Sequence, residues 1–126
     1  MRALVALASL LLLSLLILSA CTTVSGGEEI PIVAGERDGQ MYFEPKVVTV
    51  KAGSKVTFVI KNTGKVDHEF ESIEPGEAGI DEIIIPPGRT RRVNWTAPSK
   101  PATYPVYCDF PGHRAAGMEF TLEVVE

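Results

Sequence analysis

Residues 102–125 read ATYPVYCDFPGHRAAGMEFTLEVV. Both ends of this stretch are rich in β-branched and aromatic residues, as strands are, whereas its middle has the proline and glycine content of a loop. The loop holds a thiol, an imidazole and a thioether (Cys108, His113 and Met118), each separated from the next by four residues. This combination of ligands suits copper that alternates between Cu(I) and Cu(II). The stretch therefore predicts two strands joined by a copper-binding loop.

The same strand pattern recurs along the rest of the chain, while helical periodicity is absent after the amino-terminal segment. Further strands are expected at residues 46–51, 55–61, 68–73, 82–85 and 89–96. Glycine and proline turns separate them at short intervals. Many short strands of this kind predict an all-β fold, a single-domain sandwich or barrel, and exclude an α/β fold.

The amino terminus has the layout of an export signal. A basic start at Arg2 precedes an apolar, leucine-rich run over residues 3–18, and small residues follow at Ser19 and Ala20. This order of basic, apolar and small residues is typical of a secretory signal peptide, which we assign to residues 1–20.

Cys21 directly follows the signal, and Leu18-Ser19-Ala20-Cys21 resembles the lipobox of bacterial lipoproteins. The resemblance implies that Cys21 is lipidated and anchors the protein to a membrane outside the cytoplasm, at the periplasm or the outer cell surface. An ordinary signal followed by a coincidental cysteine is the alternative. Residues 21–29 are polar and contain glycine, which predicts a flexible tether, and residues 30–126 form the expected domain.

The numbers of cysteines and histidines in the chain bear on the metal site. With Cys21 assigned to the lipid, Cys108 is the single thiol of the exported domain, so no disulfide is expected there and the thiol must be buried or committed to a ligand. His68 is the only histidine besides His113 and begins a different strand. Individually, such residues are more often surface or core residues than ligands. Together with Met118 they predict a mononuclear copper site.

The net charge of the chain limits the kinds of macromolecule that it can bind. The formal net charge is −4, and no basic stripe interleaved with aromatic residues occurs, so nucleic acid is excluded as a partner.

Residues 41–125 resemble a cupredoxin, the family of small blue copper proteins that includes plastocyanin and azurin. Three motifs carry the resemblance: Phe43 and Pro45 leading into the strand at 47–51, His68 with Phe70, and the run from Tyr107 to Met118. The resemblance implies a Greek-key β-sandwich. It also implies one copper ion with His68, Cys108 and His113 in a trigonal set, Met118 as a weak axial ligand, and one-electron transfer with little geometric change.

Two positions depart from the family pattern. Glu69 stands where asparagine is common, and Asp109 stands where a small hydroxyl residue is common. These carboxylates, with Asp67, either repel one another or pair with Arg114, and they change the expected hydrogen bonding around the thiolate.

The sequence favours electron transfer by a monomer. We expect an apolar patch around His113, formed by Pro111, Gly112, Ala115 and Ala116 with the turn at 86–88, where a redox protein docks. The alternative with the same residues is copper sequestration or delivery. Structural zinc and a metal-free scaffold are lesser alternatives, because zinc has no use for a thioether. An enzyme is not expected, since a nucleophilic pair of Cys108 and His113 would leave Met118 and His68 without a role.

Overall fold

The computed structural model describes residues 27–126, and every regular element within them is a β-strand. The nine strands are β1 Glu28–Arg37, β2 Gln40–Glu44, β3 Val47–Lys51, β4 Lys55–Asn62, β5 His68–Ser72, β6 Ile80–Ile85, β7 Thr90–Thr96, β8 Ala102–Tyr107 and β9 Glu119–Val125. Within the described residues, no helix is long and apolar enough to cross a membrane.

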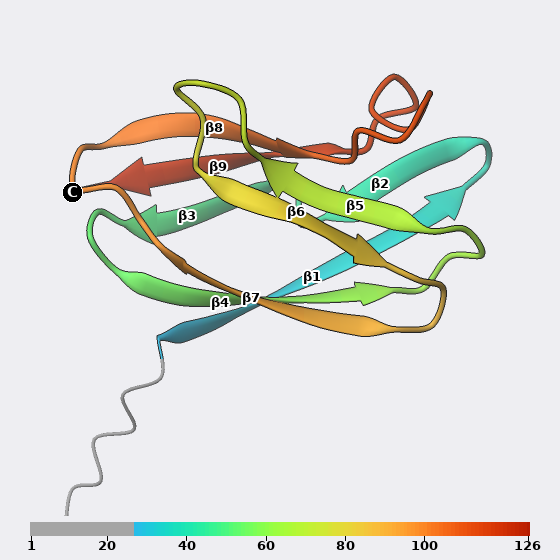
Figure 1. The fold of residues 1–126 in the computed structure, drawn as a ribbon, viewed down its shortest axis with the longest axis horizontal. Helices are drawn as coiled ribbons and strands as arrows, with labels where there is room; N and C mark the ends of the chain where they lie inside the picture. The colour runs from blue at the N-terminus through green and yellow to red at the C-terminus, as the bar shows by residue number, and fades with distance from the viewer. Residues whose placement is uncertain (1–26) are drawn as a thin grey trace, which may run out of the picture.

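The strands form two sheets packed face to face (Figure 1). One sheet has the order β2-β1-β4-β7, and the other has the order β3-β9-β8-β5-β6. The pairs β1–β4 and β3–β9 are parallel, whereas the other pairs are antiparallel. The chain thus passes repeatedly between the sheets, which confirms the predicted all-β, Greek-key sandwich.

Alternation along the strands places one row of side chains in the core. On β9, Phe120, Leu122 and Val124 are buried, while the residues between them are partly exposed. The centre of the core is aromatic, and Phe70 packs against Phe58 with a centroid distance of 5.4 Å and against Phe43 at 5.7 Å. Because Phe70 lies two residues after His68, this cluster supports the strand that carries the first histidine.

The first two strands were not predicted. β1 includes Glu28 and Glu29, which the sequence analysis assigned to the tether. Glu28 pairs with Val56 and Glu29 with Thr57 in the parallel ladder with β4, and the Glu29 carboxylate forms an ion pair with Arg92 on β7. The first strand therefore begins at Glu28, two residues before the expected start of the domain. The predicted signal peptide, residues 1–20, and Cys21 lie outside the described residues.

Segments distant in sequence meet at one end of the sandwich, on the right in Figure 1. The β1–β2 hairpin, the β4–β5 loop, the β6–β7 turn and the β8–β9 loop all lie there. The β8–β9 loop carries the predicted cysteine, histidine and methionine, and β5 begins with His68 at the same end.

Candidate metal centre

The structure brings three of the four predicted ligands together. The nitrogens of His68 and His113 and the sulfur of Cys108 lie within 4.8 Å of one another. Nδ1 of His68 is 3.4 Å from Nδ1 of His113, which is 3.3 Å from the sulfur of Cys108. Three donors about 2.1 Å from one first-row metal ion in a plane would be about 3.6 Å apart. The donor spacing and the donor types therefore fit a copper ion.

The strand ends place these side chains. His68 is the first residue of β5, and Cys108 directly follows β8. Both are fully buried, whereas His113, in the β8–β9 loop, is half-buried. The site thus lies at the edge of the core, with one histidine facing the surface.

Backbone hydrogen bonds close the β8–β9 loop around Met118. The N–H of Cys108 donates to the carbonyl of Met118 at 3.1 Å, and the N–H of Met118 donates to the carbonyl of His113 at 3.1 Å. Met118 is fully buried. Gly117 has a φ of +102°, and a Cβ there would lie 3.3 Å from the carbonyl oxygen of Met41, so this position requires glycine. The loop backbone therefore ties Met118 to Cys108 and His113, two of the other three predicted ligands.

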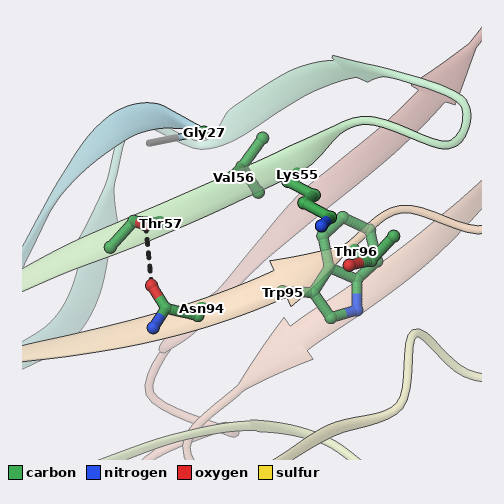
Figure 2. Close-up of a pocket in the computed structure, with 7 residues that line it drawn as sticks. All are labelled: Gly27, Lys55, Val56, Thr57, Asn94, Trp95 and Thr96. Carbon is green, nitrogen blue, oxygen red and sulfur yellow. Dashed lines mark hydrogen bonds between the residues drawn. The ribbon is translucent and has the colours of Figure 1, made fainter. Parts of the chain in front are cut away.

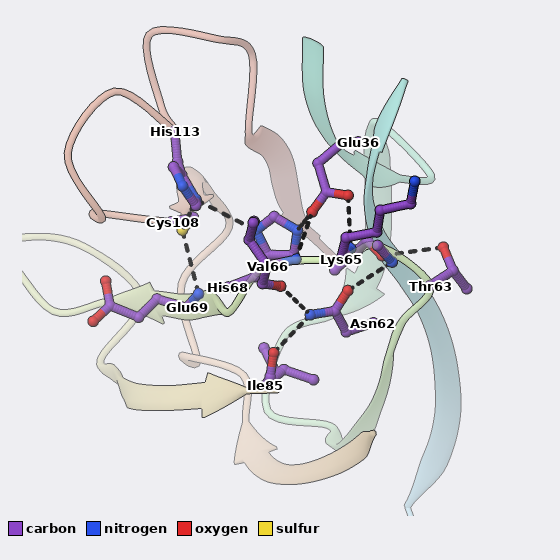
Figure 3. Close-up of polar contacts among 12 residues, drawn as sticks. Glu36, Asn62, Thr63, Lys65, Val66, His68, Glu69, Ile85, Cys108 and His113 are labelled. Carbon is purple, nitrogen blue, oxygen red and sulfur yellow. Dashed lines mark hydrogen bonds and ion pairs between the residues drawn. The ribbon is translucent and has the colours of Figure 1, made fainter. Parts of the chain in front are cut away.

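The thiol receives a hydrogen bond from the main chain. The N–H of Glu69 lies 3.2 Å from the sulfur of Cys108 and donates to it, which links β5 to the residue after β8 (Figure 3). Because the donor is a backbone group, this link does not depend on the side chain at position 69. The departure from the family pattern at Glu69 therefore leaves the bond to sulfur intact.

Without a metal, burial favours the uncharged forms of Cys108 and His68. Burial raises the pKa of the Cys108 thiol, although the backbone N–H groups of Glu69 and Phe110 act in the opposite direction. Burial also lowers the pKa of the His68 imidazole, against the attraction of Glu36. A bound cation reverses this balance by stabilising the thiolate, so metal binding releases a proton from the site.

A carboxylate that the sequence analysis did not identify touches the site. Oε1 of Glu36, near the end of β1, lies 2.9 Å from Nε2 of His68 (Figure 3). The same carboxylate accepts hydrogen bonds from the N–H groups of Lys65 and Val66. Partial burial raises the pKa of Glu36, but these two hydrogen bonds and the attraction of His68 outweigh it, and the pKa lies below its ordinary value. No local sequence motif indicates a role for Glu36, because only the fold brings β1 beside the β4–β5 loop.

Arg114 does not neutralise the carboxylates beside the site. Its guanidinium lies over the ring of Tyr107, 3.9 Å from the ring centroid, and its Nε donates to Glu119. Burial, followed by repulsion from Glu82 and Asp109, instead raises the pKa of Glu69. Of the two alternatives for the acidic residues, the structure favours repulsion.

A surface hollow of about 290 Å³ lies along the start of β4 and the end of β7, at the end of the sandwich opposite the metal centre, and Figure 2 shows the residues that line it. It is lined by Gly27, Lys55, Val56, Thr57, Asn94, Trp95 and Thr96. Thr57 donates to Asn94 across it at 2.8 Å, so these two polar side chains are engaged with each other. The metal centre is therefore separate from this hollow.

Comparison with known proteins agrees with this geometry. A family model described as a cupredoxin-like domain matches residues 8–118. The chain is similar to the copper-resistant cuproprotein CopI of Pseudomonas aeruginosa, with 28% identity over 131 aligned residues that cover 68% of this chain and 72% of that protein. It is also similar to a plastocyanin of Prochlorothrix hollandica, with 33% identity over 86 residues that cover 65% of this chain and 62% of that protein.

A solved structure shows the same fold. The crystal structure of reduced auracyanin from Roseiflexus castenholzii matches with a TM-score of 0.64 and 23% identity, over 80% of this chain and 99% of that one. A copper-containing nitrite reductase from Thermus scotoductus matches with a TM-score of 0.66 and 14% identity, but only 31% of that chain is covered. The similar proteins of comparable size are copper proteins and not enzymes, which confirms the expectation from the sequence.

Proposed function

The chain belongs to the cupredoxin-like family, and on that premise we propose that it carries single electrons by means of one copper ion held by His68, Cys108, His113 and Met118. The observation that carries the proposal is the spacing of the two Nδ1 atoms and the sulfur, which already fits one ion. When bound, copper supplies a one-electron Cu(I)/Cu(II) couple to which thiolate, imidazole and thioether donors are suited.

The residues of the protein contribute rigidity. His68 and Cys108 are fully buried, and the backbone N–H of Glu69 bridges their two strands at the sulfur. Cys108, His113 and Met118 are joined by backbone hydrogen bonds inside one loop. A set of donors held in this way rearranges little when the charge of a bound ion changes, which favours rapid electron exchange.

Electrons enter and leave through His113 in this proposal. His113 is the half-buried member of the set, and exposed Pro111 and Ala115 and half-buried Phe110 lie beside it in the loop. The ring of Phe110 packs edge-on against the imidazole, with 5.6 Å between centroids. A small apolar surface of this kind supports brief docking of a redox protein, because a small interface gives weak affinity and fast release.

The spectrum of the copper-loaded protein tests the proposal. Native protein loaded with Cu(II) is expected to show a strong thiolate-to-copper charge-transfer band, and Cys108→Ser is expected to abolish it because the hydroxyl does not replace the thiolate. Thr103→Ser, on an exposed position of β8, is the matched control and should leave the band unchanged. A Cys108→Ser protein that kept the band would refute the site.

We further propose that the domain works outside the cytoplasm and is anchored by a lipid on Cys21. The sequence Leu18-Ser19-Ala20-Cys21 supports this assignment. Cys21→Ser should give unprocessed or released protein when membrane and soluble fractions are compared. A variant that is still processed and still fractionates with membranes would reject the lipid anchor.

Copper sequestration or delivery is the second candidate. The similarity to a copper-resistant cuproprotein favours it. The sequence argues against sequestration, because it contains only two histidines and three methionines and so offers few additional ligands for copper.

A further inference from the structure

We infer that Glu36 is a positioning residue of the metal centre, whose carboxylate holds the His68 ring with Nδ1 turned toward Cys108 and His113. The inference rests on the proposed copper site and extends it to a residue beyond the four ligands.

The carboxylate of Glu36 is fixed in place from two sides. Its Oε2 accepts a hydrogen bond from the N–H of Lys65 at 2.9 Å, and its Oε1 accepts one from the N–H of Val66 at 3.3 Å (Figure 3). Both donors belong to the β4–β5 loop, which leads directly into His68. Glu36 therefore joins the end of β1 to the segment that sets the position of the ligand.

Asn62 holds the same loop in shape. Its Oδ1 accepts from the N–H of Gly64 at 2.8 Å, and its Nδ2 donates to the carbonyl of Val66 at 2.8 Å. Asn62 is fully buried. The N–H groups that donate to the Glu36 carboxylate thus belong to a loop whose shape is fixed by the hydrogen bonds of Asn62.

His68 needs the acceptor that Glu36 provides. The imidazole is fully buried, and its Nε2 has no aligned hydrogen-bond partner. Oε1 of Glu36 lies 2.9 Å from this nitrogen, so the distance between the two atoms, though not their alignment, is that of a hydrogen bond. A buried N–H without an acceptor is costly, so the carboxylate is the natural partner.

This contact selects one tautomer of His68. With the proton on Nε2, the ring donates to the carboxylate and leaves the lone pair of Nδ1 free toward His113 and Cys108. With the proton on Nδ1, the lone pair of Nε2 would face a carboxylate oxygen and be repelled. Glu36 therefore presents the nitrogen that a metal requires before any metal arrives.

Gly64 makes room for the carboxylate. A Cβ at position 64 would lie 2.3 Å from Oε1 and 2.4 Å from Oε2 of Glu36. Because both atoms are at the end of a flexible side chain, alanine at this position would displace the carboxylate and leave the backbone in place. Gly64→Ala is thus a second way to break the contact that leaves Glu36 itself unchanged.

The negative charge also acts on a bound metal. A carboxylate hydrogen-bonded to a ligating imidazole makes the imidazole a better donor and favours the more highly charged Cu(II) over Cu(I). Loss of this partner is expected to weaken Cu(II) binding by about 10- to 100-fold, the usual effect of removing such an outer partner.

The first test uses metal-free protein, in which the nitrogen chemical shifts of the His68 ring report which atom carries the proton. Native protein should show the proton on Nε2. Glu36→Leu and Gly64→Ala should both shift the ring toward a mixture of tautomers, and core amide signals from β9 report that the fold is kept. A His68 ring that keeps the Nε2 proton in both variants would overturn the inference.

The second test measures the reduction potential of the copper-loaded protein. Glu36→Gln removes the charge and should raise the potential, whereas Glu44→Gln removes an exposed charge on β2 and should leave it nearly unchanged. Glu36→Leu removes the contact altogether, so adding Gly64→Ala to Glu36→Leu should change the potential no further. Equal potentials for native and Glu36→Gln protein would overturn the inference, while an intact charge-transfer band in the same samples would leave the proposed function standing.

Discussion

Glu71 is a buried carboxylate on the strand that carries the first histidine. All five residues of β5 are buried, and Glu71 is 4% exposed. Burial raises its pKa, and repulsion from Glu69, Asp109 and Glu82 raises it further. The ionised form of Glu71 therefore costs folding free energy that a neutral side chain of the same shape would not.

This cost has a defined pH dependence. Because the pKa of Glu71 is higher in the folded protein than in the unfolded chain, the cost is fully present above the folded pKa and is lost as the pH falls toward the ordinary value of 4.5. Glu71→Gln should thus raise the free energy of unfolding of metal-free protein at pH 7, and the gain should shrink toward pH 4.

Urea denaturation across this range measures the effect. Glu28→Gln, at an exposed carboxylate where β1 begins, is the control and should give no comparable gain. If Glu71→Gln stabilises the protein equally at pH 7 and at pH 4, the explanation from buried charge is wrong.

At the level of the elements, the sequence predicts the strands from β3 to β9 and misses β1 and β2. β3, β4, β7, β8 and β9 follow the expected period or turn signals closely. β1 contains Pro31 and begins with two glutamates, so its sequence looks like a tether. It becomes a strand because it pairs in parallel with β4, a contact between distant segments that no local pattern encodes.

The same distinction applies to the metal centre. Cys108, His113 and Met118 share one loop, so their spacing in the sequence reveals them, and His68 follows as the remaining histidine. Glu36 and Asn62 are contributed by β1 and β4, and only the packing of these strands beside the β4–β5 loop gives them a role. Tyr107 is buried, with the guanidinium of Arg114 over its ring.

Asn62 joins three elements at the end of the sandwich that holds the metal centre. Its side chain donates to Ile85 at the end of β6 and to Val66, and accepts from Gly64. Asn62→Ala should lower the free energy of unfolding by about 3 kcal/mol, since one buried and two partly buried hydrogen bonds of about 1 kcal/mol each are lost.

Chemical denaturation of the metal-free variants checks this value. Asn94→Ala, which loses one hydrogen bond with Thr57 on the exposed side of β7, is the control and should cost about 1 kcal/mol or less. An Asn62→Ala variant no less stable than Asn94→Ala would mean that the loop is held by other contacts.

For the whole molecule, the two ends of the sandwich differ in structure. The end with the β8–β9 loop carries the half-buried His113, and the opposite end carries the surface hollow beside Trp95 (Figures 1 and 2). If redox partners dock at the His113 end, a charge added there should hinder electron exchange, while a charge added at the other end should not.

Ala115→Glu tests whether a charge at the His113 end hinders electron exchange. Ala115 is exposed in the β8–β9 loop, and a carboxylate there makes two approaching copies repel each other, so electron self-exchange between oxidised and reduced protein should slow at low salt. Ala102→Glu, exposed at the start of β8 at the opposite end, is the matched control. Line broadening in mixtures of the two oxidation states gives the rates. Equal rates in the two variants would move the docking surface away from His113.

Voltammetry of the native, copper-loaded domain, with the metal content determined after each cycle, tests the central claim most directly. An electron carrier keeps one copper ion per chain in both oxidation states, because its donors are held in place before the ion changes charge. We predict a reversible one-electron wave with one copper retained throughout. An irreversible wave, or copper released on reduction or oxidation, would contradict electron transfer and favour copper storage or delivery.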